Sequence, residues 1–218
     1  MQMAYFLAVS VFYVIIFWLR VFEHTEISKF FISSFVLLTV LYSFANAKDK
    51  SFKQGSLLVT LALAFAFIAE TVINFFPKLP VPGVTIFCAT HICLVIYYFK
   101  RKSLESKEIL YAIPLLAISV IFCIAILPNV TLKLFLYGVP IYMVLLTLML
   151  WRAVCMFNDK DGLKIILGSV LFYLVDISVI MVRAYGSSTA LNIETWAMYP
   201  PALFLLSLVG SKNNLLRK

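Results

Sequence analysis

Eight apolar runs, each about long enough to cross a bilayer, divide almost the whole chain. A hydrocarbon core about 30 Å thick requires about 20 predominantly apolar residues in a helix. The composition agrees, since 63% of the 218 residues are hydrophobic, 13% are charged and the mean hydropathy is +1.02. We therefore expect one all-α integral membrane domain over residues 1–218. The runs predict helices near 3–21, 30–46, 55–76, 82–99, 109–127, 134–152, 163–182 and 194–210.

The basic residues are divided unevenly between the two ends of these helices. Five lie at one end: Arg20, Lys29, Lys78, Lys133 and Arg183. The other 13 lie at the end that holds the second, fourth and sixth connections and the C-terminus: Lys48, Lys50, Lys53, Lys100, Arg101, Lys102, Lys107, Arg152, Lys160, Lys164, Lys212, Arg217 and Lys218. Because cytoplasmic loops are enriched in Lys and Arg, both termini are predicted to be cytoplasmic. The net charge of +8 is thereby explained as a topology signal, and we expect no nucleic-acid partner. In a bacterium the expected location is the plasma (inner) membrane.

Two acidic residues, Glu70 and Asp176, lie inside otherwise apolar runs. A carboxylate at the centre of a bilayer costs about 2.5 kcal/mol or more, so an acid within a span indicates a functional site. Glu70 is expected about 22 Å, and Asp176 about 20 Å, from the cytoplasmic ends of their helices. His91, Tyr137 and Tyr142 fall in the same outer half of the membrane. The sequence predicts one chamber in this layer, open to the non-cytoplasmic side or to the outer leaflet.

The surroundings of the two acids are similar in residues 67–73 and 173–179. The acids are 106 residues apart, which is about half of the chain. Four spans followed by four spans in the same orientation would produce this spacing, as parallel repeats do in other membrane proteins. We therefore consider a parallel repeat of four plus four helices, in which the acids face one another.

Other polar groups allow more than one interpretation. Lys29 and Arg183 lie at the outer ends of spans, where basic side chains ordinarily extend to the headgroup region. They could equally hold a phosphate, which arginine binds in bidentate fashion. A metal site built from Glu70, His91 and Asp176 is an alternative, although these residues come from three helices without a local ligand spacing. We expect no metal and no other cofactor.

A first motif joins the third and fourth spans. Ala69-Glu70 precedes a turn and then Gly83-x-x-x-Phe87-x-x-x-His91. This pattern resembles the YhhN-like family of membrane proteins, which includes lysoplasmalogenase. In that family an apolar span ends in Gly-Asp and is followed by Gly-x-x-x-Phe-x-x-x-His. Glu70 therefore keeps the acid, but it stands where the family usually has Asp, and Ala69 stands where it has Gly.

A second motif resembles the same family near the C-terminus. Gly168-x-x-x-Phe172-x-x-Val175-Asp176 corresponds to Gly-x-x-x-Phe-x-x-Ser-Asp, with Val175 at the position of the usual Ser. Residues 142–153 also resemble the family's sixth helix. The resemblance covers spans two to eight.

The resemblance implies hydrolysis of the vinyl ether bond of a lysoplasmalogen, a lysophospholipid, with release of a fatty aldehyde and a glycerophospho-base. A vinyl ether is hydrolysed by protonation of its enol carbon, followed by addition of water to the oxocarbenium ion. This chemistry suits one protonated carboxyl and one carboxylate, as in glycosidases. The expected catalytic residues are Glu70, Asp176, His91 and Tyr142, and the expected substrate-binding residues are Lys29, Arg183 and Tyr137.

Two other functions are compatible with the same residues. A non-catalytic lipid-binding protein of the same fold would explain the departures from the family motifs. A proton-coupled transporter of small molecules would also place acids and a histidine at one depth in the membrane. The sequence does not indicate an oligomeric state.

Overall fold

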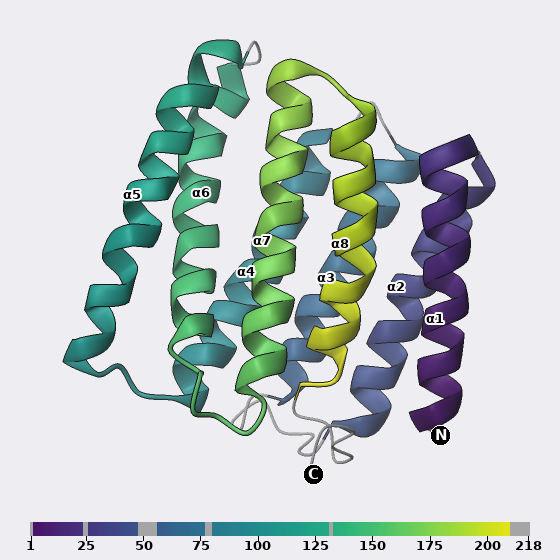
Figure 1. The fold of residues 1–218 in the computed structure, drawn as a ribbon, viewed down its shortest axis with the longest axis horizontal. Coiled ribbons are helices and arrows are strands. Elements are labelled where there is room, and N and C mark those ends of the chain that lie inside the picture. The colour runs from purple at the N-terminus through teal and green to yellow at the C-terminus, as the bar shows by residue number, and fades with distance from the viewer. Residues whose placement is uncertain (1, 24–25, 48–55, 77–79, 131–132, 210–218) are drawn as a thin grey trace.

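The structure, a computed structural model, describes residues 2–23, 26–47, 56–76, 80–130 and 133–209 (Figure 1). Within these residues every predicted span is helical, and there is no strand. The α-helices are α1 (Gln2–Trp18), α2 (Glu26–Asn46), α3 (Ser56–Phe75), α4 (Pro80–Arg101), α5 (Ile109–Ile126), α6 (Lys133–Val154), α7 (Gly162–Tyr185) and α8 (Thr189–Ser207). The prediction of an all-α membrane bundle is confirmed. A π-helical turn, Leu19–Glu23, continues α1 and carries Arg20.

Seven helices of the described residues, α1 to α7, are long and apolar enough to cross a membrane. The predicted eighth span, α8, has 19 residues but is interrupted by polar side chains such as Asn192 and Glu194 and by Pro200 and Pro201. It contacts α7 most extensively and also lies against α1, α2 and α3. Because these neighbours shield much of α8 from the surroundings, it does not need an apolar surface on every side.

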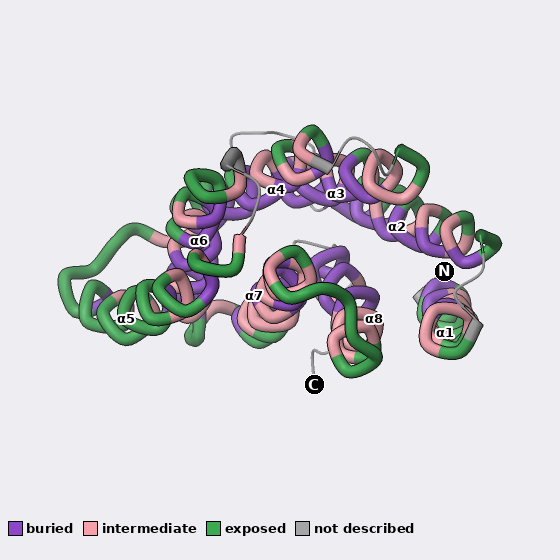
Figure 2. Tube along the Cα trace, turned by 90° about the horizontal axis from the view of Figure 1, so that it is seen from above, coloured by how far each residue is buried: buried purple, intermediate pink, exposed green. Residues whose placement is uncertain are grey.

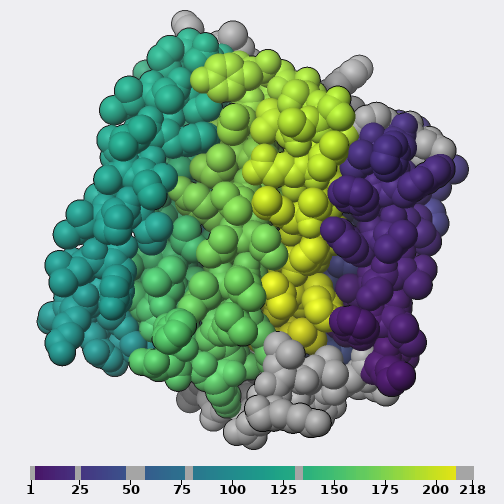
Figure 3. All heavy atoms as spheres, in the orientation of Figure 1, coloured from purple at the N-terminus to yellow at the C-terminus, as the bar shows by residue number. Residues whose placement is uncertain are grey.

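The helices form two layers. In Figure 2, α6, α4, α3 and α2 follow one another along one side of the molecule, and α7 and α8 lie against the inner side of this row. Figure 3 shows the opposite face, where α5, α7, α8 and α1 succeed one another across the surface. The outermost helices, α1 and α5, have few buried residues. In the most apolar stretch of each helix, only 17% of the residues of α1 and 11% of those of α5 are buried. The core therefore lies between α7 and α8 on one side and α3, α4 and α6 on the other.

The contacts between helices repeat from one half of the chain to the other. α1 contacts α2 as α5 contacts α6, and α2 contacts α3 as α6 contacts α7. The pair α3 and α4 corresponds to α7 and α8, and the contact of α4 with α6 corresponds to that of α8 with α2. This pattern supports the predicted relationship between two sets of four helices. The beginning of α1 and the end of α8 lie at the same end of the bundle (Figure 1).

Equivalent positions in the two halves carry the two acids. α3 begins at Ser56 and α7 begins at Gly162, so Glu70 and Asp176 each lie 14 residues into their helix. At about 1.5 Å per residue, both carboxyl-bearing positions are about 21 Å from the beginning of the helix. The expected common depth of the two acids along their helices is thus found in the structure.

The end of the bundle at which α3 and α7 begin is held together by charged residues. We call these residues the ion-pair cluster: Arg101, Lys102, Glu108, Arg152, Asp159, Asp161 and Lys164. Arg101 on α4 donates to both oxygens of Asp159, at 2.8 and 2.5 Å, and to Asp161 at 2.8 Å. Lys164 on α7 donates to Asp161 at 3.0 Å. These contacts fasten α4 to the connection between α6 and α7.

A second part of the cluster joins α6 to the connection before α5. The fully buried guanidinium of Arg152 donates to Glu108 at 3.0 Å and to the carbonyl of Lys102 at 2.6 Å. Lys102 also donates to the Glu108 carboxylate. The basic residues that sequence assigned to this end are therefore partly structural. Other residues on which the predicted orientation rests lie outside the described residues: Lys48, Lys50, Lys53, Lys78, Lys212, Arg217 and Lys218.

Candidate active site

A cavity of about 440 Å³ lies between α3, α4, α6, α7 and α8. Its volume is within the range of small-molecule sites, about 300–1,000 Å³. The lining includes Glu70, Asp176 and Tyr142, whereas most of the other side chains are aliphatic or aromatic. It also includes residues near the ends of α3 and α7 and near the beginnings of α4, α6 and α8. The cavity therefore extends from the layer of the acids towards the end of the bundle opposite the ion-pair cluster.

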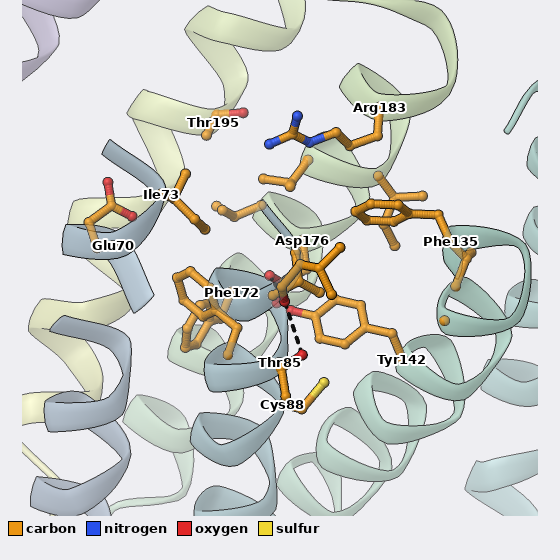
Figure 4. A pocket seen from close by; sticks show the side chains of 18 of the residues that line it. Glu70, Ile73, Thr85, Cys88, Phe135, Tyr142, Phe172, Asp176, Arg183 and Thr195 are labelled. Atoms are coloured by element: carbon orange, nitrogen blue, oxygen red, sulfur yellow. Dashed lines mark hydrogen bonds between the residues drawn. The ribbon is translucent and has the colours of Figure 1, made fainter. Parts of the chain in front are cut away.

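Three of the predicted catalytic residues are in direct contact. Tyr142 on α6 donates its hydroxyl proton to Asp176 Oδ1 on α7, with 2.8 Å between the oxygens (Figure 4). His91 on α4 places Nε2 3.0 Å from the Tyr142 oxygen and 3.2 Å from Asp176 Oδ2. His91 is completely buried, and Phe172 packs against its ring with 5.1 Å between the centroids. Three helices thus fix one triad of polar side chains beside the cavity.

The contacts of this triad allow more than one arrangement of its protons. His91 Nδ1 lies 3.2 Å from the sulfur of Met149, and its Nε2 atom faces both Tyr142 and Asp176. Either ring nitrogen donates or accepts, according to which of them carries the proton. The three side chains therefore form a continuous set of contacts through which a proton can pass between Asp176 and His91.

Glu70 belongs to a different hydrogen-bonding network. Asn74, one helical turn further along α3, donates to Glu70 Oε1 at 2.6 Å. The carbonyl oxygen of the same amide accepts a hydrogen bond from Arg20 at 3.0 Å. The Arg20 guanidinium lies over the Trp196 ring of α8, 4.7 Å from its centroid. A cation therefore faces Glu70 through one neutral amide.

The two acids border the same cavity but do not form a hydrogen-bonded pair. In Figure 4, Glu70 lies to one side, and Ile73 and Phe172 appear between it and Asp176. Tyr199 of α8 is buried and within electrostatic reach of both carboxyls. The expectation that the acids share one chamber is met, but their hydrogen-bond partners differ.

Sequence analysis missed several residues of this site. Asn74 lies four residues after Glu70, and this helical spacing is a signal that could have identified it. Arg20 was considered only as a topology signal, because nothing in the sequence shows that α1 brings it to α3. Trp196 and Tyr199 were not distinguished from the other aromatic residues of the chain. Both line the cavity.

Two of the three predicted substrate-binding residues line the cavity, and the third does not. Arg183 and Tyr137 line the cavity towards the end of the bundle opposite the ion-pair cluster, and Figure 4 shows the Arg183 guanidinium above Asp176. Lys29 is not among the lining residues and instead donates to Glu26 at 2.7 Å. Within the described ranges, no group of three His, Cys, Asp or Glu side chains is arranged to hold a metal ion, so the alternative metal site gains no support.

Comparison with known proteins agrees with the arrangement of these motifs. The YhhN family matches residues 28–209, a segment that contains α3, α4, α6 and α7 with every member of the triad. No curated protein and no solved structure matches the chain. Because the family match covers most of the 218 residues, this multi-pass membrane protein belongs to the YhhN family.

Proposed function

We propose that the protein is an intramembrane hydrolase that cleaves the vinyl ether bond of lysoplasmalogen-type lysophospholipids. The observation that carries this proposal is the set of close contacts among His91, Tyr142 and Asp176 at the wall of an apolar cavity that Glu70 also lines. Hydrolysis of a vinyl ether begins with transfer of a proton to carbon, which requires an acid held near the double bond. Membership of the YhhN family is consistent with this activity.

In the proposed first step, Asp176 transfers its proton to the carbon of the double bond that is not bonded to the ether oxygen. A C–H bond forms, the C=C π bond is lost, and the positive charge is shared by the adjacent carbon and the ether oxygen. The Asp176 carboxylate then accepts a proton from the attacking water through contact with His91 and Tyr142. The resulting hemiacetal collapses to a fatty aldehyde and the hydroxyl group of the glycerophospho-base, so every proton is returned.

Glu70 has a separate role in this mechanism. It contacts Asn74 and, through that amide, faces the cation Arg20, so we assign it the carboxylate role. A fixed negative charge beside the cavity stabilises an oxocarbenium ion as it forms and is already oriented before the reaction. The proposal therefore assigns proton donation to Asp176 and charge stabilisation to Glu70.

Arg183 is the proposed partner of the substrate phosphate. It lies seven residues after Asp176 on α7, which corresponds to about 10 Å along the helix. A guanidinium binds phosphate through two parallel hydrogen bonds. With the phosphate at Arg183, the glycerol portion points inwards and the vinyl ether approaches the acids. Tyr137 lines the same outer part of the cavity, whereas Lys29 has no place in this scheme.

Aldehyde release by the purified protein tests the proposal. The substrate is a lysoplasmalogen, and the matched control is the saturated alkyl ether lysophospholipid of the same chain length and headgroup, which has no enol carbon to protonate. We expect aldehyde only from the vinyl ether, and loss of turnover in Asp176→Asn and Glu70→Gln. Turnover that survived both substitutions would contradict the two-carboxylate mechanism. Tight binding of intact lysolipid without aldehyde would indicate a lipid-binding protein instead.

A further inference from the structure

The cavity reaches the side of the bundle between α4 and α6. From α4 it is lined by Thr85 and Cys88, and from α6 by Tyr137 and Ile141. Tyr137 is 72% exposed and Ile141 is 70% exposed, and Thr85 is also exposed. A side chain that both borders a cavity and lies open on the outer surface marks the rim of that cavity. The rim therefore includes the flank of the bundle, where spans of a membrane protein face lipid.

The backbone of α6 leaves space at this rim. Gly138 lines the cavity, and a Cβ atom built at this position would have no atom within 4 Å. Pro140, inside the same helix, has no N–H with which to bond the preceding turn. α4 and α6 nevertheless contact each other, so the space at Gly138 is a local opening in a packed pair.

The chemical character of the cavity changes along its length. Its cation, Arg183, lies at the outer end, and the carboxyls of Asp176 and Glu70 lie further in. The part of the wall contributed by α4 and α6 is mainly aliphatic and aromatic. This order matches a molecule with one anionic headgroup and one hydrocarbon chain. The polar groups of this wall are few, namely the hydroxyls of Thr85, Tyr137 and Tyr142 and the thiol of Cys88.

We infer that the opening beside Gly138, between α4 and α6, is a lateral portal through which the single hydrocarbon chain of a membrane lipid reaches the cavity. The chain remains between the two helices while the headgroup lies at Arg183. A lysolipid therefore does not have to leave the bilayer to reach the acids. The identity of the bond that is cleaved rests on the proposed function, whereas the binding of the chain does not.

A bulky side chain at the portal tests this inference. Gly138→Trp fills the space that no other atom occupies, and Thr85→Trp narrows the portal from α4. Ala117→Trp is the matched control, because Ala117 is exposed on α5 and is not among the residues lining the cavity. Thermal melting and size-exclusion profiles establish that each variant is folded.

The first measurement does not depend on catalysis. Wild type and variants in lipid nanodiscs are mixed with a single-chain phosphocholine that carries a photoactivated diazirine near the end of its chain, and the labelled peptides are identified by mass spectrometry. We expect labels within residues 81–88 and 137–141. Labelling should fall about tenfold in both portal variants, since overfilling a site weakens its occupation, but not in Ala117→Trp. Labels elsewhere, or equal labelling in all variants, would overturn the portal.

The second measurement compares two substrates. Turnover of a long-chain lysoplasmalogen in nanodiscs should fall in the portal variants by a larger factor than turnover of a short-chain, water-soluble vinyl ether, and Ala117→Trp should change neither. Labelling at the portal without any aldehyde from wild type would support the portal and contradict the proposed hydrolase. Aldehyde from wild type with no effect of either portal variant would support the hydrolase and contradict the portal.

Discussion

The two polar regions of the bundle differ in what their charges face. In the ion-pair cluster, each carboxylate meets one or more cations across a helix connection, as Glu108 meets Lys102 and Arg152. In the cavity, Asp176 meets a histidine and a tyrosine, and its Oδ2 atom accepts no well-oriented hydrogen bond. In the first arrangement the opposite charges meet one another directly, although Arg152 Nε has no hydrogen-bond partner within the described residues. The second arrangement borders an apolar cavity.

This difference shows why burial alone does not identify a functional charge. Arg152 is completely buried, as is His91, and Glu108 is as buried as Asp176. A buried pair that satisfies all its members mainly restricts how helices pack. A buried group beside a cavity retains the capacity to bind or react. Four predictions test whether the two regions have these separate roles, beginning with the largest expected effect.

Asp176→Asn should abolish most of the hydrolase activity. The substitution preserves the size of the side chain but removes the proposed proton donor, and positioned acids or bases contribute about 10²–10⁴ in rate. The measurement is the rate of aldehyde release per folded protein. Asp161→Asn in the ion-pair cluster is the control, and it should lower thermal stability while leaving the rate constant unchanged. An equal fall in the rate of aldehyde release in both variants would contradict separate roles for the two regions.

Glu108→Gln should destabilise the fold without a specific effect on catalysis. The substitution leaves the buried Arg152 guanidinium without its carboxylate, and loss of one partner of a buried ion pair costs about 3 kcal/mol. The free energy of unfolding is measured in mixed micelles. The double variant Glu108→Leu/Arg152→Met removes both charges and should recover part of the loss. Equal instability of the single and double variants would show that the pair is not the source of the effect.

Asn74→Leu should reduce turnover about tenfold, because it removes a hydrogen bond to a charged group that acts in the transition state. A positioning role predicts a lower kcat with an unchanged KM, whereas general damage to the cavity would raise KM as well. Arg20→Met removes the other end of the same chain of contacts. If the amide couples Arg20 to Glu70, the effects of the two substitutions will not add in the double variant. Additive effects of the two substitutions on turnover would show that Arg20 does not act through Asn74.

Acid should weaken the ion-pair cluster through Asp159, which lies outside the spans. Burial alone would raise the pKa of this carboxyl, but hydrogen bonds from Arg101 hold the pKa below its usual value of 3.8. Its contribution to stability is complete above about pH 4 and is lost as the pH falls through the lower pKa of the folded state. Melting temperatures between pH 3 and 7 should show this decline. Asp159→Asn should be less stable near neutral pH and should flatten the curve.

Much of the fold could be predicted because the bilayer imposes a simple rule. The apolar runs ended close to the helix ends, as the run 109–127 and α5 (Ile109–Ile126) illustrate. The predicted equal depths of Glu70 and Asp176 also agree with the structure, because residue number along a straight helix gives the axial position. The predicted eighth span is a helix, α8, but polar residues interrupt it, and it is not among the helices that are apolar enough to cross a membrane. Several neighbouring helices contact α8.

The partners within the site were harder to predict. The contact of His91 with Tyr142 joins residues 51 positions apart, and Arg20 meets Asn74 across 54 positions. Hydropathy records which residues lie in a span but not the rotation of one helix about its axis relative to another. Lys29 illustrates this limit. It lies at a helix end, as expected, but its side chain bonds to Glu26 and does not line the cavity.

The sequence by itself determined the class of fold, the number of long helices, the level of the acids and membership of the YhhN family. Each of these follows from local hydropathy, from helical rise or from short motifs. Only the tertiary structure decided that Asp176 shares a proton network with His91 and Tyr142 while Glu70 faces Arg20 through Asn74. Side-chain contacts between helices depend on how the helices pack and rotate, and this is set by the whole bundle at once.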